Sequence, residues 1–105
     1  MERLIELEQE YSDIIFSHSV GNEASVDWTD HYVHENHILE YVRYMKKHSK
    51  KAITFCENYV PWLDKLKYLV KEIDFISIHT YPVWEYKHIH DSLEYTKQNY
   101  YAVAN

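Results

Sequence analysis

Three short polar clusters in this sequence contain residue types that could do chemistry. They are Gly21-Asn22-Glu23, Glu57-Asn58-Tyr59 and His79-Thr80-Tyr81-Pro82. Each cluster directly follows a run of apolar and β-branched residues, which is typical of a β-strand. The carboxylate of Glu23 could act as a general acid or base, or it could merely begin a helix and interact with the helix dipole.

Helical and strand patterns alternate along the chain and would position these clusters. Helices are predicted over 1–11, 29–48 (with Thr29 or Asp30 as N-cap), 61–73 and 89–104, and strands over 14–20, 51–56 and 74–79. Such alternation predicts an α/β fold, α-(βα)3, with three parallel strands and right-handed crossovers. Functional groups of these folds lie at the carboxyl ends of the strands, so all three clusters should share one rim.

Length and composition exclude several classes of protein. The chain has 105 residues, enough for one small domain, and 46% of them are hydrophobic, which argues against disorder. The net charge of −6 argues against nucleic acid and acidic membrane surfaces as partners. No apolar run approaches the roughly 20 residues that span a bilayer, and residues 1–10 do not resemble a signal peptide. The single glycine is Gly21, whose position therefore needs a reason.

Metal and thiol chemistry find little support in the sequence. His31, His34 and His37 could place imidazoles on one helix, but the outer pair is turned by about 240°, so a solvated helix face is the better interpretation. The lone Cys56 excludes an internal disulfide and a multi-cysteine zinc site, and it is most simply a small buried hydrophobe. We therefore expect no cofactor and no metal.

Two segments resemble glycoside hydrolase family 17, the β-1,3-glucanase-like enzymes of clan A. Val20-Gly21-Asn22-Glu23 is similar to the family's VGNE motif at the end of the fourth barrel strand. The segment 74–82, DFISIHTYP, is similar to the sixth-strand segment, and 52–62 lies where a fifth strand is expected. The resemblance implies that residues 1–105 are the central part of a (β/α)8 barrel, from about the third helix to the sixth.

The resemblance also implies a retaining mechanism on the O-glycosidic bonds of a β-glucan. Such enzymes hold two carboxylates about 5–5.5 Å apart, one as nucleophile and one as acid/base. Glu23 matches the acid/base, a role that requires a raised pKa. Asn22 matches the residue that hydrogen-bonds the sugar 2-hydroxyl, and Tyr81 matches an aromatic residue near the nucleophile, although both could instead be structural.

Further residues of the rim could bind an oligo- or polysaccharide. His79 alternates with Phe75 and Ser77 and is expected to face the barrel interior. Trp84 could stack on a sugar, although ordinary packing is the alternative, which we favour for Trp62. Asn58 follows the second strand and is a further candidate for substrate binding.

The sequence departs from the family at the nucleophile, which lies on a seventh strand that these residues do not contain. Glu57 lies on the rim and could replace it, although family members do not use that position. We therefore expect this chain alone to be inactive, and the alternative function is a carbohydrate-binding relic without catalysis. A doubly wound domain with an unrelated ligand is disfavoured, because no glycine-rich phosphate loop follows a strand. The compartment is unknown; secretion or cell-surface location is an option for the parent enzyme.

The predicted sheet has consequences for the behaviour of the chain alone. Three parallel strands leave two open edges, which barrel closure would remove. An apolar inward face would normally meet the opposite strands of the barrel. If the protein is naturally this short, we expect it to self-associate.

Overall fold

A computed structural model describes residues 1–26, 28, 30 and 32–104 of the chain. Its elements are α1 (Glu2–Glu10), β1 (Ser17–Asn22), α2 (Glu35–His48), β2 (Ala52–Asn58), α3 (Tyr59–Leu63), the 3₁₀ turn η1 (Lys67–Leu69), β3 (Ser77–His79) and α4 (Ile89–Ala104). The three strands form one parallel sheet in the order β1-β2-β3. The structure therefore confirms the predicted α/β class with three parallel strands alternating with helices.

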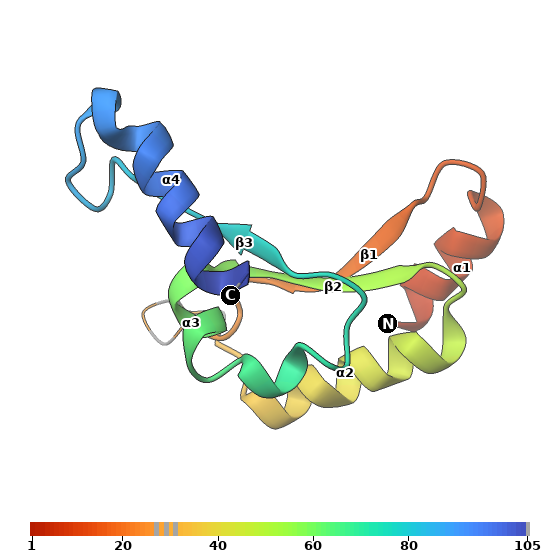
Figure 1. Cartoon of the computed structure of the whole chain (residues 1–105). Coiled ribbons are helices and arrows are strands. Elements are labelled where there is room, and N and C mark those ends of the chain that lie inside the picture. The colour runs from red at the N-terminus through yellow and green to blue at the C-terminus, as the bar shows by residue number, and fades with distance from the viewer. Residues whose placement is uncertain (27, 29, 31, 105) are drawn as a thin grey trace.

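The hydrophobic core lies between one face of the sheet and the helices α2 and α3, which Figure 1 shows on the same side of the strands. Ile53 and Phe55 of β2 are buried there. They belong to one apolar cluster with Ile38 and Met45 of α2 and Trp62 of α3. Burying such side chains contributes about 1.5–3 kcal/mol each, so this cluster is the main stabilising element of the fold.

The opposite face of the sheet differs from the apolar surface expected for it. Side chains alternate across a strand, so Thr54, between the core residues Ile53 and Phe55, faces away from α2. Ser19 is the register partner of Thr54 and lies on the same face. The hydroxyl of Thr54 lies 2.8 Å from that of Ser77 on β3. Small polar residues therefore line this face, and two of them, Thr54 and Ser77, hydrogen-bond to each other. The expectation of an apolar inward face was wrong.

The pairing of β1 with β2 contains an irregularity just before the Glu23 cluster. Ser19 pairs with Thr54, but Asn22 pairs with Cys56, so β1 uses one residue more than β2 over this stretch. The side chain of Ser19 replaces backbone hydrogen bonds at this irregularity. Its hydroxyl donates to the carbonyl of Gly21 (2.6 Å) and accepts from the backbone N–H of Cys56 (3.2 Å). The bulge keeps Asn22 on the same face as Cys56.

Strand boundaries differ from prediction at β1 and β3. Residues 14 and 15 belong to a turn after α1 rather than to β1, and the side chain of Ile14 is 75% exposed. β3 begins at Ser77 instead of 74, because Asp74 binds the start of β2 with both its backbone and its side chain. Its N–H donates to the carbonyl of Ile53 (2.8 Å), and its carboxylate accepts from the N–H of Ile53 (2.7 Å).

The helices also differ from their predicted bounds. α2 begins at Glu35 with His34 as N-cap, whose ring nitrogen accepts from the N–H of Asn36 (3.2 Å); the predicted cap Asp30 lies in a turn, and Thr29 lies outside the described residues. The predicted helix 61–73 is the short α3 followed by η1 rather than one continuous helix. No described helix is long and apolar enough to cross a membrane.

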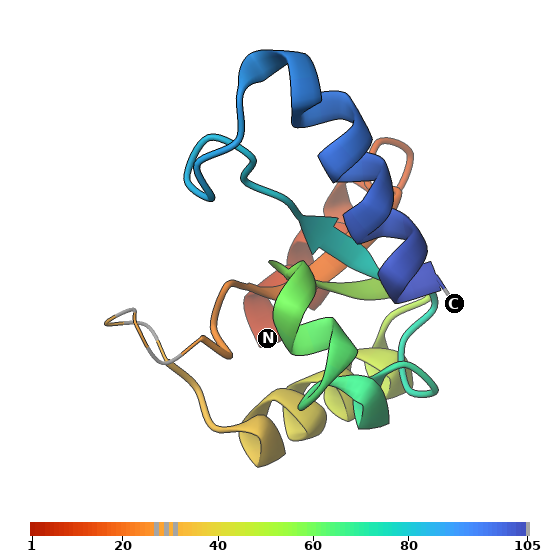
Figure 2. The same cartoon turned by 60° about the vertical axis from the view of Figure 1, so that its left-hand side comes forward.

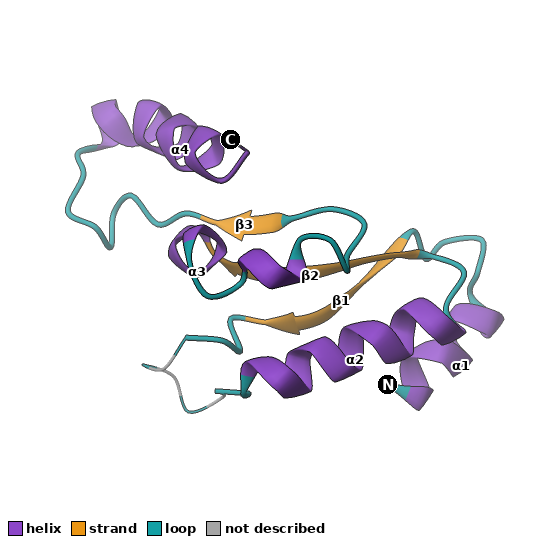
Figure 3. Cartoon of the chain, turned by 60° about the horizontal axis from the view of Figure 1, so that its bottom comes forward, coloured by secondary structure: helices purple, strands orange, loops and turns teal. Residues whose placement is uncertain are grey.

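α4 has the predicted bounds, but only part of the face predicted to be buried is covered. The helical spacing predicts that this face contains Ile89, Leu93, Thr96, Tyr100 and Val103. Ile89, Leu93 and Tyr100 are exposed, whereas Asn99 is buried. Figures 2 and 3 show α4 lying beyond β3, away from α2. Its packing is with α3 and, through Val103, with the margin of the core. A large part of its apolar surface therefore remains open to solvent.

Candidate active site at the carboxyl ends of the strands

Glu23 is the centre of a hydrogen-bonded group at the carboxyl ends of β1 and β3. Its Oε1 accepts a hydrogen bond from the hydroxyl of Tyr81 and lies 3.1 Å from Nδ1 of His79. The Tyr81 hydroxyl also lies 3.0 Å from that ring nitrogen. The carboxylate and the imidazole are both about 30% exposed (30% and 28%), so solvent reaches the group. The structure thus brings together three residues that the sequence predicted for the site.

The backbone at Glu23 has an unusual conformation. Its φ is 52°, in the left-handed region that residues with a side chain seldom adopt. The N–H of Glu23 donates to the carbonyl of Cys56 on β2 (2.9 Å), which ties this residue to the neighbouring strand. Such conformations persist where surrounding contacts enforce them, and they concentrate at functional sites.

The electrostatics of Glu23 contradict the raised pKa expected of a proton donor. Hydrogen bonds from Tyr81 and then from His79 stabilise the carboxylate and lower the pKa of Glu23, and partial burial opposes them without outweighing them. In the geometry described here Glu23 is therefore held as a carboxylate at neutral pH.

Tyr81 is the complementary partner in this group. Its hydrogen bond to Glu23, followed by burial and the nearby negative charges, raises the pKa of Tyr81 to about 12. The phenol therefore keeps its proton at neutral pH and donates to the carboxylate. The sequence predicted that Tyr81 lies beside a nucleophile. Among the described residues, the carboxylate that it contacts is Glu23.

An open cleft of about 650 Å³ adjoins this group. Trp28 and Trp84 contribute large aromatic surfaces to it and are 70% and 80% exposed. The residues that line the cleft are Glu23, Trp28, Asn58, Val60, Tyr81, Trp84 and Glu85. Exposed aromatic rings beside polar groups can contact the apolar C–H face and the hydroxyls of a sugar.

The other residues predicted for the site, and Trp62, lie in different surroundings. Asn22 is exposed at the end of β1, immediately before Glu23. Asn58 lines the cleft, but its side-chain oxygen is occupied as the N-cap of α3, where it accepts from the N–H of Val60 (2.9 Å). Trp62 packs in the core as favoured, and its indole N–H donates to the carbonyl of Ser77 (3.1 Å).

Glu57 does not act as a second carboxylate facing the cleft. Its side chain is fully buried, and both of its oxygens accept hydrogen bonds from Ser25 or Asn58. A nucleophile must reach the substrate, so Glu57 in this position cannot replace the seventh-strand residue of the family.

Sequence reasoning missed three residues that line the cleft, Trp28, Val60 and Glu85. Trp28 lies five residues after Glu23, in a segment without strand or helix periodicity. Its aromatic side chain was therefore the one signal in the sequence that could have indicated a place in the cleft. Glu85 follows Trp84, and its carboxylate is 3.5 Å from the hydroxyl of Tyr59, which in turn lies 3.0 Å from that of Tyr95. These contacts connect the β3–α4 loop to α3 and α4.

Metal and thiol chemistry gain no support from the described residues. Among them no group of three His, Cys, Asp or Glu side chains could hold a metal ion. His34 and His37 are exposed, as expected for a solvated face, and His31 lies outside the described residues. Cys56 is half-buried rather than fully buried.

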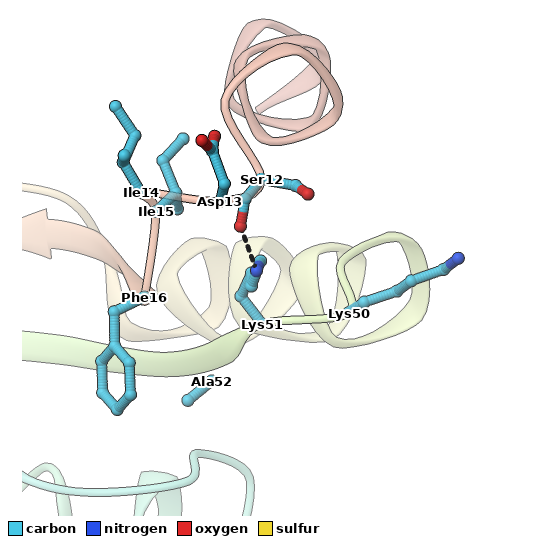
Figure 4. A pocket seen from close by; sticks show the side chains of 8 residues that line it. All are labelled: Ser12, Asp13, Ile14, Ile15, Phe16, Lys50, Lys51 and Ala52. Atoms are coloured by element: carbon cyan, nitrogen blue, oxygen red, sulfur yellow. Dashed lines mark hydrogen bonds between the residues drawn. The ribbon is translucent and has the colours of Figure 1, made fainter.

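A second pocket lies at the opposite, amino-terminal end of the strands (Figure 4). Its polar contact is the ammonium of Lys51, which donates to the carbonyl of Ser12 (2.6 Å). Ile14 and Phe16 line it and are largely exposed. The side chains of Asp13, Lys50 and Phe16 also line this pocket, but they point in different directions (Figure 4). Glu23, His79 and Tyr81 instead converge beside the other cleft, so we assign the candidate active site to that cleft.

Comparisons with protein-family models, with curated proteins and with solved structures found no match for this chain. The α/β class follows from the structure itself. The resemblance to glycoside hydrolases rests on the sequence motifs.

Proposed function

We propose that residues 1–105 form the central segment of a retaining glycoside hydrolase barrel that acts on a β-glucan. The observation that carries the proposal is the convergence of Glu23, His79 and Tyr81 from two strand ends beside an aromatic-lined cleft. The segment would run from about the third helix to the sixth of a (β/α)8 barrel. An oligo- or polysaccharide is the expected partner, with no nucleic acid, membrane, metal or cofactor.

In this function Glu23 would protonate the leaving glycosidic oxygen and then deprotonate the incoming water. That role needs a higher pKa than the described contacts give the carboxyl. A nucleophile about 5–5.5 Å away would supply this, because a neighbouring negative charge disfavours ionisation. It would also compete for the Tyr81 hydroxyl, which now stabilises the carboxylate of Glu23. The lowered pKa is therefore compatible with the proposal only when a second carboxylate completes the site.

Substrate binding would use the polar and aromatic groups around Glu23. Trp84 and Trp28 would stack on pyranose rings, and the exposed Asn22 would hydrogen-bond a sugar hydroxyl next to the scissile bond. His79 would orient Glu23 rather than contact sugar directly, because its Nδ1 faces the carboxylate.

Binding can be tested with the 105-residue chain. We expect β-1,3-linked gluco-oligosaccharides to quench tryptophan fluorescence and to perturb the NMR signals of Glu23 and Tyr81, with millimolar affinity because the cleft is open. Trp84→Ala should abolish the response. Tyr86→Ala is the matched control, since Tyr86 is exposed in the same loop but does not line the cleft. An α-linked glucan should not bind, and equal loss in both variants would contradict the proposed cleft.

Catalysis is testable where the segment is joined to a strand that ends in a glutamate. There we expect Glu23→Gln to reduce hydrolysis of laminarin-type substrates by roughly 10²–10⁴-fold without unfolding the protein. If hydrolysis is unchanged, Glu23 is not the acid/base. If the reading frame beyond Asn105 encodes no such strand, the enzymatic assignment fails for that protein.

The second candidate function is carbohydrate binding without catalysis. It is favoured by the lowered pKa of Glu23, which disfavours the role of proton donor, and by the burial of Glu57, which keeps that carboxylate out of reach of a substrate. Glu85 also lines the cleft, and its carboxylate lies 3.5 Å from the hydroxyl of Tyr59. Sugar binding to the chain with no hydrolysis in any longer natural form would select this alternative.

A further inference from the structure

Glu57 is a buried carboxylate that the proposed reaction does not use. It is the sixth residue of β2 and is fully inaccessible to solvent. Burial of a carboxylate is unfavourable unless hydrogen bonds or opposite charges compensate it. Among the described residues no lysine, arginine or histidine forms an ion pair with Glu57, so its compensation comes from hydrogen-bond donors.

Two of its three donors belong to one residue of the loop that follows Glu23. The N–H and the hydroxyl of Ser25 both donate to Oε2 of Glu57, at 3.0 and 2.6 Å. The third donor, the N–H of Asn58 at 2.6 Å, binds the other oxygen. Ser25 is also fully buried, so this clamp joins the end of β2 to the β1 loop without competition from water.

The clamp stabilises a backbone conformation that is unfavourable for a residue with a side chain. Glu23 lies two residues before Ser25 and has a φ of 52°. The carbonyl of Cys56 fixes the N–H of Glu23 on one side, and Glu57 fixes Ser25 on the other. Consecutive residues of β2 thus hold both ends of a three-residue turn. This fixed turn aims the Glu23 carboxylate at His79, the last residue of β3, and at Tyr81, two residues beyond it.

We propose that Glu57 is a positioning residue that holds Glu23, through Ser25, in the orientation that contacts Tyr81 and His79. The catalytic importance of that orientation rests on the proposed function, but the mechanical link between Glu57 and Glu23 does not. A glutamine is nearly isosteric with Glu57, but it offers one acceptor in place of two. It cannot accept from Ser25 with one end and from Asn58 with the other.

The test is a pH titration of the Glu23 side-chain carboxyl, followed by ¹³C NMR in the full chain. In Glu57→Gln we expect the titration midpoint of Glu23 to move upward, because the carboxylate loses alignment with Tyr81 and His79. Loss of the Glu57 charge alone would move this midpoint downward, because a like charge disfavours ionisation. The sign of the shift therefore separates positioning from electrostatics.

Two further variants complete the design. In a Tyr81→Phe background, Glu57→Gln should shift the midpoint of Glu23 less than in the wild type, because the aligned partner is already absent. Glu94→Gln removes the same charge from an exposed site on α4 and should leave the midpoint unchanged. An unchanged or lowered midpoint in folded Glu57→Gln would overturn the proposal.

Ser25→Ala tests the positioning role of Glu57 if Glu57→Gln does not fold. It keeps the Ser25 N–H but removes the hydroxyl donor, so we expect a smaller upward shift of the Glu23 midpoint, and no shift would overturn the proposal. The titration requires no sugar. An upward shift without sugar binding would therefore refute the proposed function alone, whereas sugar binding without a shift would refute the positioning role alone.

Discussion

The proton affinity of Glu23 depends on His79, at the end of β3, and on Tyr81, two residues beyond that strand. β1 and β3 are separated by β2, yet Tyr81 and His79 reach the carboxylate across the end of the sheet. Tyr81 makes the larger contribution to the lowered pKa. The phenol is therefore the most informative single substitution at the site.

In Tyr81→Phe the pKa of Glu23 should rise, because the strongest hydrogen bond to the carboxylate is lost while partial burial remains. Carboxyl NMR titration measures this directly. Tyr101→Phe, an exposed tyrosine on α4, is the control and should have no effect. A lower pKa in Tyr81→Phe would show that the phenol does not stabilise the ionised form.

The only glycine is required by a close approach rather than by its backbone angle. The φ of Gly21 is not positive, but a Cβ at this position would lie 2.9 Å from a ring carbon of Phe55. Phe55 is a buried core residue whose ring has little room to move. The bulge between Ser19 and Asn22 thus lies directly against the core.

Gly21→Ala should destabilise the protein by about 1–3 kcal/mol, the usual effect of overpacking a core. The measurement is the free energy of unfolding in urea. Phe55→Leu removes the ring that would clash, so Gly21→Ala should cost less in that background than in the wild type. Equal costs in both backgrounds would contradict the assigned contact.

The sequence predicted those residues of the site that directly follow a strand. The rule that functional groups follow parallel strands brought Glu23, His79 and Tyr81 to one rim. It could not foresee that Asn58 caps α3 or that Glu57 turns inward, because these depend on side-chain partners more than 20 residues away or on the local turn. The pKa of Glu23 was misjudged for the same reason.

At the scale of elements, α1 is attached to the sheet by a buried polar contact. Nε2 of His18 lies 2.8 Å from Glu8, which also accepts from the Ser49 hydroxyl and from the N–H of Lys50 (3.1 Å). Burial alone would raise the pKa of Glu8, but these hydrogen bonds together outweigh it and leave the pKa lowered. One carboxylate thus connects α1, β1 and the α2–β2 loop.

This contact predicts an acid-sensitive attachment of α1. Because the pKa of Glu8 is lower in the folded protein, its stabilisation is full above the unfolded value of about 4.3 and is lost as pH falls through the folded value. Glu8→Gln should lower stability by about 1–3 kcal/mol at neutral pH and flatten the loss below pH 4. Urea unfolding at several pH values measures both, with the exposed Glu10→Gln as control. A Glu8→Gln curve parallel to the wild type would refute this link.

Element types were more predictable than their ends. Alternating apolar patterns indicated three strands and the helices between them. The ends depend on single contacts, such as Asp74 binding Ile53 in place of a longer β3, and His34 capping α2. The buried face of α4 was mispredicted because Ile89, Leu93 and Tyr100 follow a helical spacing but face away from the described core.

At the scale of the whole molecule, exposed apolar groups and open strand edges favour association. β1 and β3 each have an edge without a strand partner among the described residues, and Phe16 beside β1 is 83% exposed. Unpaired edges are templates for pairing with another chain. The polar face of the sheet reduces this tendency but does not remove it.

We expect the 105-residue chain to self-associate at micromolar concentrations, as measured by sedimentation velocity. Phe16→Lys should weaken association by placing a charge next to the β1 edge, whereas Tyr86→Lys, at an exposed loop position away from both edges, should not. A monomer with a sharp, concentration-independent thermal transition would contradict this expectation.

The extra residue between Ser19 and Asn22 also affects how this region tolerates changes in length. Removing one residue there would preserve every side chain of the candidate site and restore a regular ladder. It would also leave Asn22 on the face of Cys56, because Asn22 would then follow Ser19 by two residues and alternation along a strand has a period of two. Natural variants should therefore lose one residue at this point more readily than they replace Gly21, and a gap of one column in an alignment would be the genetic signature of the bulge.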